Sequence, residues 1–198
     1  MVRKEVLRTT ETKMKTQQLS SSNLYHNTWN VQGWLMNLQL GEGKDNRTGD
    51  EVYLKSIVTK IHINSKPDRQ ASMIRALLVR VPAADATAPA DLFEGGSNGI
   101  INFVNTSECA ILAQKMVRMQ GDTVWRQGGS GVTTVQKDLN QCMTLSYNFK
   151  NAKTKYDGQY PKYWTVRLLV LAYDAHGTLT TDNIADYMCV SRLYFKDP

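Results

Sequence analysis

The residues with the clearest chemical bias are the basic ones near the N-terminus. In the first 18 residues five lysines and arginines stand against only Glu5 and Glu11, so about a tenth of the chain carries half of its formal net charge of +6. The five are Arg3, Lys4, Arg8, Lys13 and Lys15. Such side chains neutralise phosphates and release counterions, which makes them candidate nucleic-acid-binding residues. A solvated, mobile terminus without a partner explains the same pattern equally well.

The remaining residue types suited to catalysis or metal binding are scattered. His26, His62 and His176 lie far apart, with no spacing typical of a metal site or a general base. The glycines at 41–43 and 128–131 lack the strand-to-helix context and the Lys-Ser/Thr pair of a phosphate-binding loop, so we interpret both segments as turns. We expect no catalytic residues, no metal site, no cofactor and no enzymatic activity.

The cysteines and carboxylates support the same expectation. Three cysteines lie far apart in no metal-binding or dense disulfide pattern, and we expect them to be buried thiols in a reducing compartment. They are Cys109, Cys142 and Cys189. Asp174, Asp182 and Asp186 each lie near the end of a strand, but their spacing is too loose to define a Ca²⁺ site. No apolar run is long enough to span a membrane, and the N-terminus does not resemble a secretory signal; we expect a soluble, intracellular protein with no membrane partner.

The elements that must position these residues are β-strands. The clearest covers Gln141–Lys150, where Met143, Leu145, Tyr147 and Phe149 alternate with polar residues, which predicts one buried and one polar face. A second strand, Val52–Ile63, changes its alternation near Lys55, as a β-bulge would cause, and it points Lys60 and His62 away from its isoleucines.

Two further strands, Met73–Val81 and Trp164–Tyr173, are apolar on both faces and must be covered on both sides. In a sandwich one cover is the opposing sheet; the other must be a loop, a short helix or a neighbouring subunit. The closing strand, Asp186–Lys196, repeats the buried pattern in four residues. These are Met188, Val190, Leu193 and Phe195.

Long connections separate these strands at Pro82–Gly99, Gly121–Lys137 and Asn151–Tyr163, with a short helical turn expected around Ala90–Glu94. About eight antiparallel strands with long connections favour an all-β fold, a single jelly-roll β-sandwich, over a hairpin meander. We expect residues 1–22 to form a basic, flexible arm and residues 23–198 to form the jelly-roll domain.

The order of these segments resembles the capsid proteins of small circular single-stranded DNA viruses, the group that includes circoviruses. The resemblance covers residues 37–197. It rests on Gly41–Asp50 leading into Val52–Ile57, on the arginine-bearing strand Ile74–Val81, on Leu139–Lys150 with a following Tyr-Gly loop, on Trp164–Tyr173 and on the ending Arg192–Asp197. The arm departs from that family, because it is short and mixed in charge. Coat proteins of satellite RNA viruses share a similar Arg47–Val52 pattern.

The resemblance implies a viral capsid protein that assembles with itself, about 60 copies forming a small icosahedral shell. It implies packaging of single-stranded nucleic acid by non-specific electrostatics, with DNA favoured over RNA, and a location in the virion after assembly in the host nucleus or cytoplasm. The alternative is a cellular, lectin-like jelly-roll module that binds carbohydrate. A cupin-like enzyme would need a histidine and carboxylate cluster that the sequence does not contain.

Overall fold

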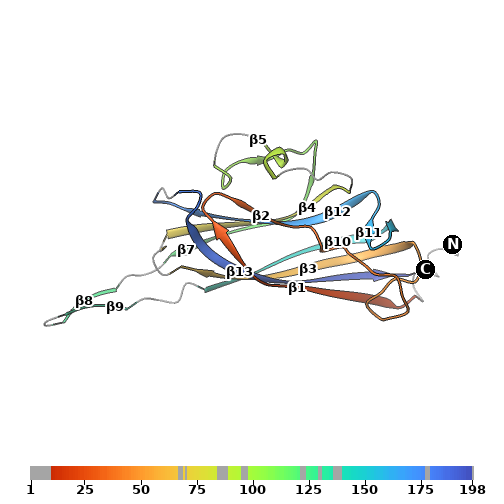
Figure 1. The fold of residues 1–198 in the computed structure, drawn as a ribbon, viewed down its shortest axis with the longest axis horizontal. Helices are drawn as coiled ribbons and strands as arrows, with labels where there is room; N and C mark the ends of the chain where they lie inside the picture. The colour runs from red at the N-terminus through yellow and green to blue at the C-terminus, as the bar shows by residue number, and fades with distance from the viewer. Residues whose placement is uncertain are drawn as a thin grey trace.

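The structure is a computed structural model of the chain, and it describes residues 10–66, 69, 71–83, 89–94, 98–120, 124–128, 131–135, 140–176 and 179–197. These residues form β-strands and one short 3₁₀ helix, η1 (Figure 1). The elements are β1 (Thr12–Tyr25), β2 (Trp29–Gln32), β3 (Glu51–Ser65), β4 (Ala71–Pro82), η1 (Pro89–Leu92), β5 (Phe93–Glu94), β6 (Phe103–Val104), β7 (Ala110–Gln120), β8 (Val124–Gly128), β9 (Gly131–Val135), β10 (Asn140–Asp157), β11 (Tyr160–Pro161), β12 (Trp164–Asp174) and β13 (Asn183–Lys196). Within the described ranges no helix is long and apolar enough to cross a membrane.

Nine of these strands build two packed antiparallel sheets. One sheet has the order β1-β13-β3-β10-β11 and the other has the order β2-β12-β4-β7. The pairing is nested: β1 pairs with β13, β2 with β12, β3 with β10 and β4 with β7, so these eight strands pair from the outside of the chain inward. A long antiparallel ribbon rolled up on itself gives this order, which confirms the predicted single jelly roll.

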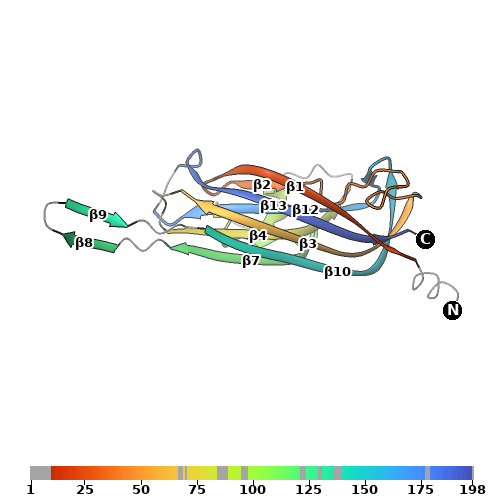
Figure 2. The same cartoon turned by 90° about the horizontal axis from the view of Figure 1, so that it is seen from below.

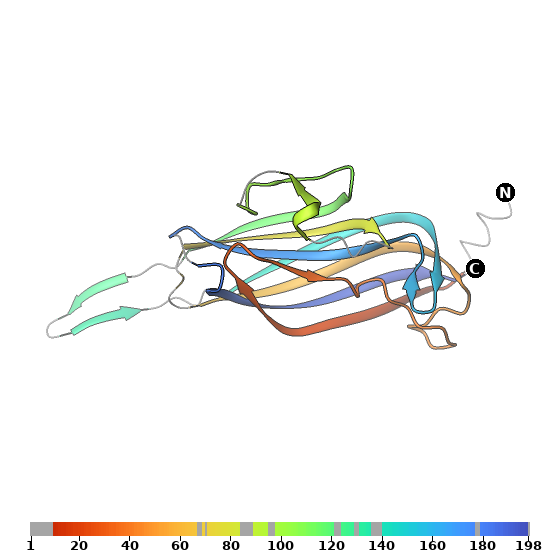
Figure 3. The same ribbon diagram turned by 45° about the horizontal axis from the view of Figure 1, so that its top comes forward.

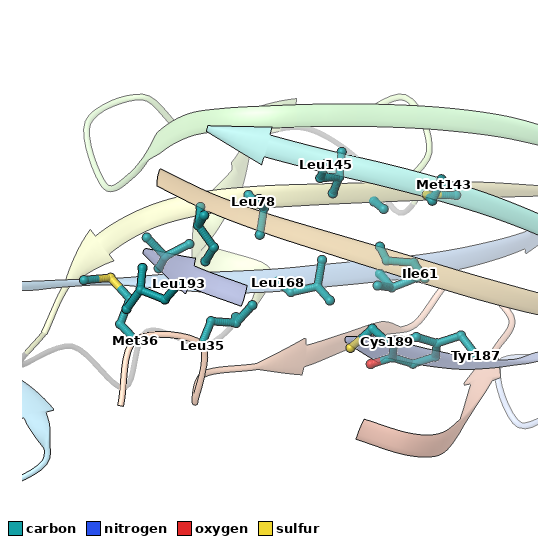
Figure 4. Packing of buried hydrophobic residues seen from close by; sticks show 14 of the residues in the cluster. Leu35, Met36, Ile61, Leu78, Met143, Leu145, Leu168, Tyr187, Cys189 and Leu193 are labelled. Carbon is teal, nitrogen blue, oxygen red and sulfur yellow. The ribbon is translucent and has the colours of Figure 1, made fainter. Parts of the chain in front are cut away.

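The core lies between the two sheets because each strand turns its apolar residues inward. Figure 4 shows Ile61, Met143 and Leu193 of one sheet facing Leu78 and Leu168 of the other. On β10, Met143, Leu145 and Phe149 are buried as predicted, whereas the side chain of Tyr147 is partly exposed.

The sheet β2-β12-β4-β7 is covered on both faces, as the apolar patterns of β4 and β12 require. Its outer face presents Leu77, Val79 and Leu169, which pack against Leu92 and Val104 of the connection between β4 and β7. This connection lies over the sheet in Figure 3 and contains η1, close to the helical turn expected at Ala90–Glu94. A loop and a short helix therefore provide the second cover; we refer to residues 89–94 and 98–109 as the cover segment.

The bulge predicted in β3 is present. On β13, Tyr194 pairs with Ser56 and Phe195 with Leu54, which leaves Lys55 without a partner. On the other side, β10 inserts three residues at the same point, with Lys150 and Asn151 at positive φ. The strand continues beyond them to Asp157, so the prediction of a loop starting at Asn151 was wrong: the bulge bends the strand without ending it.

Several strands were not predicted, and β1 is the most consequential. Residues 12–22 were expected to belong to a flexible arm, but they pair with β13 from Thr12 to Ser22, which corrects the arm boundary. In the first half of this edge strand the inward side chains meet polar groups of neighbouring segments; Gln17 Nε2, for example, donates to Asn37 O at 3.0 Å, and only Leu19 and Leu24 further along pack on the apolar core. The strand therefore has no strong apolar alternation to reveal it.

Two expectations about side-chain burial also change. Met188 and Val190 were assigned to the buried pattern of β13, yet both are exposed, and Cys189 between them is buried with Leu193 and Phe195. Cys142 is exposed, whereas the other two cysteines are buried as expected. The prediction for β13 was wrong because both faces of this strand carry apolar residues, so residue type alone does not show which face is buried.

The conspicuous arginine of the loop before β3 has a structural role. Arg47 is buried and donates to the carbonyls of Gly49 and Gly158 and to Asp50 Oδ1, and its guanidinium carbon lies 5.2 Å from the centre of the Tyr156 ring. Burial raises the pKa of Tyr156 well above its usual value. Arg47 thus fixes the loop at the β2–β3 connection to the turn after β10. At the opposite end of the sandwich, the β8–β9 hairpin extends beyond the sheets (Figure 1).

Candidate nucleic-acid interface

The five basic residues predicted to bind nucleic acid are only partly within the described structure. Arg3, Lys4 and Arg8 lie outside the described residues. Lys13 Nζ is 2.9 Å from Asp197 Oδ2 and also donates to Asn46 O, and Lys15 Nζ is 2.9 Å from Asp45 Oδ2. The hydrogen bond from Lys15 lowers the pKa of Asp45 below its usual value. Both lysines thus attach β1 to carboxylates on neighbouring segments, and nucleic-acid binding by these residues stays a prediction.

A second basic surface lies on the sheet that contains β1, β13, β3 and β10, on the side away from the core. Figure 2 shows the strands of this sheet. The pairing of the four strands aligns their outward-facing residues in four rows that run across the sheet. We call these four rows together the outer sheet face. The rows are Cys142-His62-Met188, Thr144-Lys60-Val190-Gln18, Ser146-Val58-Arg192-Thr16 and Asn148-Ser56-Tyr194-Met14.

The outer sheet face has positive and no negative side chains in these four rows. Lys60 and Arg192 are exposed, and Arg192 Nε donates to Thr16 Oγ1 at 3.2 Å. Two carboxylates beyond the rows are each paired with lysine: Glu51 with Lys153 and Lys155 at one end, and Asp186 with Lys66 at the other. Hydrogen bonds from Lys153, which has the larger effect, and from Lys155 lower the pKa of Glu51 below its usual value. An approaching anion therefore meets uncompensated positive charge at the centre of the face.

The other side chains of the face suit a single-stranded polyanion. The hydroxyl and amide groups of Thr144, Ser146 and Gln18 can donate hydrogen bonds to phosphate oxygens next to the two cations. Tyr194 adds an aromatic ring to the same face. Proteins that bind single-stranded nucleic acid use such rings as surfaces on which unpaired bases stack. An open depression of about 390 Å³ lies over the first two rows.

Sequence reasoning found part of this surface. It placed Lys60 and His62 on the outward side of β3 from the alternation with isoleucines, but it did not connect them with Arg192. The link depends on which strands are neighbours, since β3 and β13 are far apart in the chain and become adjacent only through the nested pairing. The sequence did contain one signal, the alternation of inward and outward positions along β13, which puts Arg192 on the same face as residues 188 and 190. The apolar side chains of Met188 and Val190 obscured it, because they made that face look buried.

The described residues contain no group of three or more histidine, cysteine or acidic side chains placed to hold a metal ion. Of the three aspartates considered for a Ca²⁺ site, Asp174 and Asp182 both face Arg69, at 3.5 and 3.4 Å. Asp186 lies next to Lys66. Cations of the same chain thus neutralise the carboxylates that a Ca²⁺ ion would need.

Comparison with known proteins gives remote structural likenesses only. No family model matches the chain, and no curated protein matches it. Among solved structures, that of Desmodium yellow mottle tymovirus has a TM-score of 0.42 at 14% identity, over 96% of this chain and 82% of that one. The 60-mer BFDV capsid protein has a TM-score of 0.40 at 8% identity (95% and 95%). The Triatoma virus empty capsid has a TM-score of 0.40 at 12% identity (95% and 91%). With TM-scores below 0.5 these likenesses carry no argument about function, and the fold is assigned from the strand order itself.

Proposed function

We propose that the chain is a viral capsid protein, with a structural and not a catalytic role, whose copies assemble into a small icosahedral shell around single-stranded nucleic acid. The observation that carries the proposal is a jelly-roll sandwich with a basic outer sheet face whose four central rows contain no carboxylate. A rigid two-sheet unit with connections at both ends can contact several neighbours at once. Closed symmetry with about 60 equivalent copies would give the smallest such shell.

Exposed apolar residues support self-association. On the cover segment, Ile101 and Phe103 are 72% and 78% exposed, and Tyr160 and Tyr163 are exposed around β11. Large side chains in such positions are often buried in contacts between proteins. In the proposed shell they would be covered by neighbouring copies.

The nucleic-acid part of the proposal is electrostatic. If the outer sheet face lines the interior, Lys60 and Arg192 of sixty copies would supply about 120 positive charges, to which Arg3, Lys4 and Arg8 would add. Lys13 and Lys15 would contribute only by exchanging Asp197 and Asp45 for phosphates. DNA over RNA is proposed from the sequence resemblance alone, and so is a location in the virion after assembly in the host nucleus or cytoplasm.

Electron microscopy and mass photometry of the purified protein test the proposal. Sixty copies of a 22.4 kDa chain should give closed particles of about 1.3 MDa. A monomer at every pH and salt concentration would overturn it. The lectin-like alternative instead predicts a monomer or small oligomer that binds specific sugars on a glycan array.

A further inference from the structure

The first row of the outer sheet face brings together three side chains with soft donor atoms. Cys142 on β10 pairs with His62 on β3, and His62 pairs with Met188 on β13, so the three side chains stand side by side on adjacent strands. Cys142 and Met188 are exposed and His62 is half-buried. All three line the depression over this end of the sheet.

The spacing suits one ion held between the three groups. Neighbouring strands lie about 4.8 Å apart, so the two flanking residues are about 10 Å apart at their backbones. The central imidazole stands between a short thiol side chain and a long, flexible thioether that can bend toward it. An ion above His62 is therefore within reach of Cys142 Sγ, an imidazole nitrogen and Met188 Sδ.

The three side chains are also available. Within the described part of the chain, none of them takes part in a side-chain hydrogen bond or ion pair. Other residues of the same types have partners: His26 Nδ1 accepts from Asp174 N at 3.1 Å, and Cys109 Sγ donates to Asn105 O at 3.5 Å. The free donors of the first row thus have no structural bond to break before they bind a ligand.

The donor set selects the kind of ion. Ca²⁺ and Mg²⁺ require several oxygen ligands, and the four rows contain no carboxylate. Thiolate and thioether ligands suit soft ions, Cu(I) among them. Structural Zn²⁺ sites use four ligands drawn from Cys, His, Asp and Glu, of which the first row offers only two, so the set of one thiolate, one imidazole and one thioether favours Cu(I). Because the thiol proton leaves as the Cu–S bond forms, the thiolate and the ion neutralise each other, and nearby Lys60 does not repel the complex.

We infer that Cys142, His62 and Met188 form a binding site for Cu(I). The inference concerns a single chain and holds whether or not the copies assemble. Binding involves no change in oxidation state: Cu(I) enters, one proton leaves the thiol, and the imidazole and thioether donate lone pairs.

The test is an anaerobic titration of the reduced, purified protein with the coloured Cu(I)–bicinchoninate complex. The wild-type protein should remove one equivalent of Cu(I) per chain from the complex. Cys142→Ser should lose this binding, and His62→Gln and Met188→Leu should each weaken it by at least about tenfold. X-ray absorption of the loaded protein should show two sulfur neighbours and one nitrogen neighbour around copper.

Matched variants separate the site from general affinity for copper. Met14→Leu replaces another exposed methionine on the same sheet, and His176→Gln replaces an exposed histidine elsewhere; both should bind like the wild type. Circular dichroism checks that every variant is folded. The inference fails if the wild type removes no Cu(I), if Cys142→Ser binds as tightly as the wild type, or if the two matched variants lose as much affinity as the site variants.

Discussion

At the scale of single residues, Arg75 attaches the cover segment to the sandwich. Its side chain is only 5% exposed, and Nη1 donates to the carbonyls of Gly99, Ile100 and Asn102 at 2.9, 3.2 and 2.8 Å. Trp29 and Phe93 stack at a centroid distance of 4.4 Å, and the guanidinium lies within 6 Å of both rings. Burial lowers the pKa of Arg75 from its usual high value. One cation thus satisfies three carbonyl groups of a segment with little regular structure.

Replacement of Arg75 should therefore destabilise the protein. Arg75→Met keeps much of the side-chain volume but leaves the carbonyls without a donor, and we expect a loss of about 2–4 kcal/mol in the free energy of unfolding, measured in urea. Arg80→Met is the matched control, because the exposed Arg80 lies over the Trp164 ring and donates to no carbonyl group among the described residues. It should cost about 1 kcal/mol or less. Equal costs for the two variants would contradict this role for Arg75.

Cys189 makes a second prediction, concerning alkaline pH. Burial raises the pKa of its thiol from 9.0 to about 11. Above pH 9 the unfolded chain loses this proton while the folded chain retains it, so the contribution to stability is complete below pH 9 and is lost as the pH rises toward 11. The free energy of unfolding of the wild type should fall by about 2–3 kcal/mol more than that of Cys189→Ala over this interval. A difference between the two proteins that stays constant from pH 8 to 11 would show that the thiol titrates normally when folded.

At the scale of elements, β1 determines where a deletion of the basic N-terminus should stop. Deleting residues 1–9 removes Arg3, Lys4 and Arg8 but leaves the strand with its ion pairs from Lys13 to Asp197 and from Lys15 to Asp45. We expect this variant to keep its stability within about 0.5 kcal/mol and to co-purify with less nucleic acid, measured by the ratio of absorbance at 260 and 280 nm.

The longer deletion of residues 1–15 is the comparison. It also removes four residues of β1 and both ion pairs, so we expect a loss of about 1–3 kcal/mol in stability, measured by urea unfolding. If the short deletion leaves nucleic-acid content unchanged, residues 1–9 do not bind it.

The elements also show what the sequence can and cannot predict. Strands β3, β4, β10, β12 and β13 were predicted because each places apolar residues in a core between two sheets. The edge strands β1 and β7 escaped prediction because only part of each faces the core. On the 14-residue β1, only Leu24 is fully buried. The inward residues Lys13, Lys15 and Gln17 bond to polar groups of other segments, so the first half of β1 carries no periodic apolar signal.

The candidate interface was even less predictable, because its charges come from strands far apart in the sequence. Lys60 and Arg192 belong to the second and third rows of one face only after β3 and β13 pair. Lys13 and Lys15, two of the five residues of the predicted cluster, are close in sequence. In the structure each of them faces a carboxylate contributed by a distant segment, which a count of charges along the sequence does not detect.

At the scale of the whole molecule, the two sheets should differ in their affinity for nucleic acid. Replacing Lys60 and Arg192 by glutamine removes the two cations of the outer sheet face. We expect the slope of log affinity against log salt concentration for a single-stranded oligonucleotide to become shallower by about 1.4 units, measured by fluorescence anisotropy. The reason is that two fewer phosphates are neutralised.

The matched control makes the same change of charge on the other sheet. Lys115→Gln with Arg118→Gln replaces two exposed cations on β7 and should leave the slope unchanged. If both double variants reduce the slope equally, binding depends on net charge and not on the outer sheet face.

The nested pairing also determines when the protein can fold during its synthesis. The ion pair between Lys13 and Asp197 joins residues 184 positions apart, and β13 lies between β1 and β3 in their sheet. While β13 is still in the ribosome, β1 and β3 lack the strand that joins them, and their edges and apolar residues stay exposed to other nascent chains. Folding with so high a contact order is slow and must wait for β13 to emerge, so chaperones that shield nascent chains should strongly affect the yield of native protein.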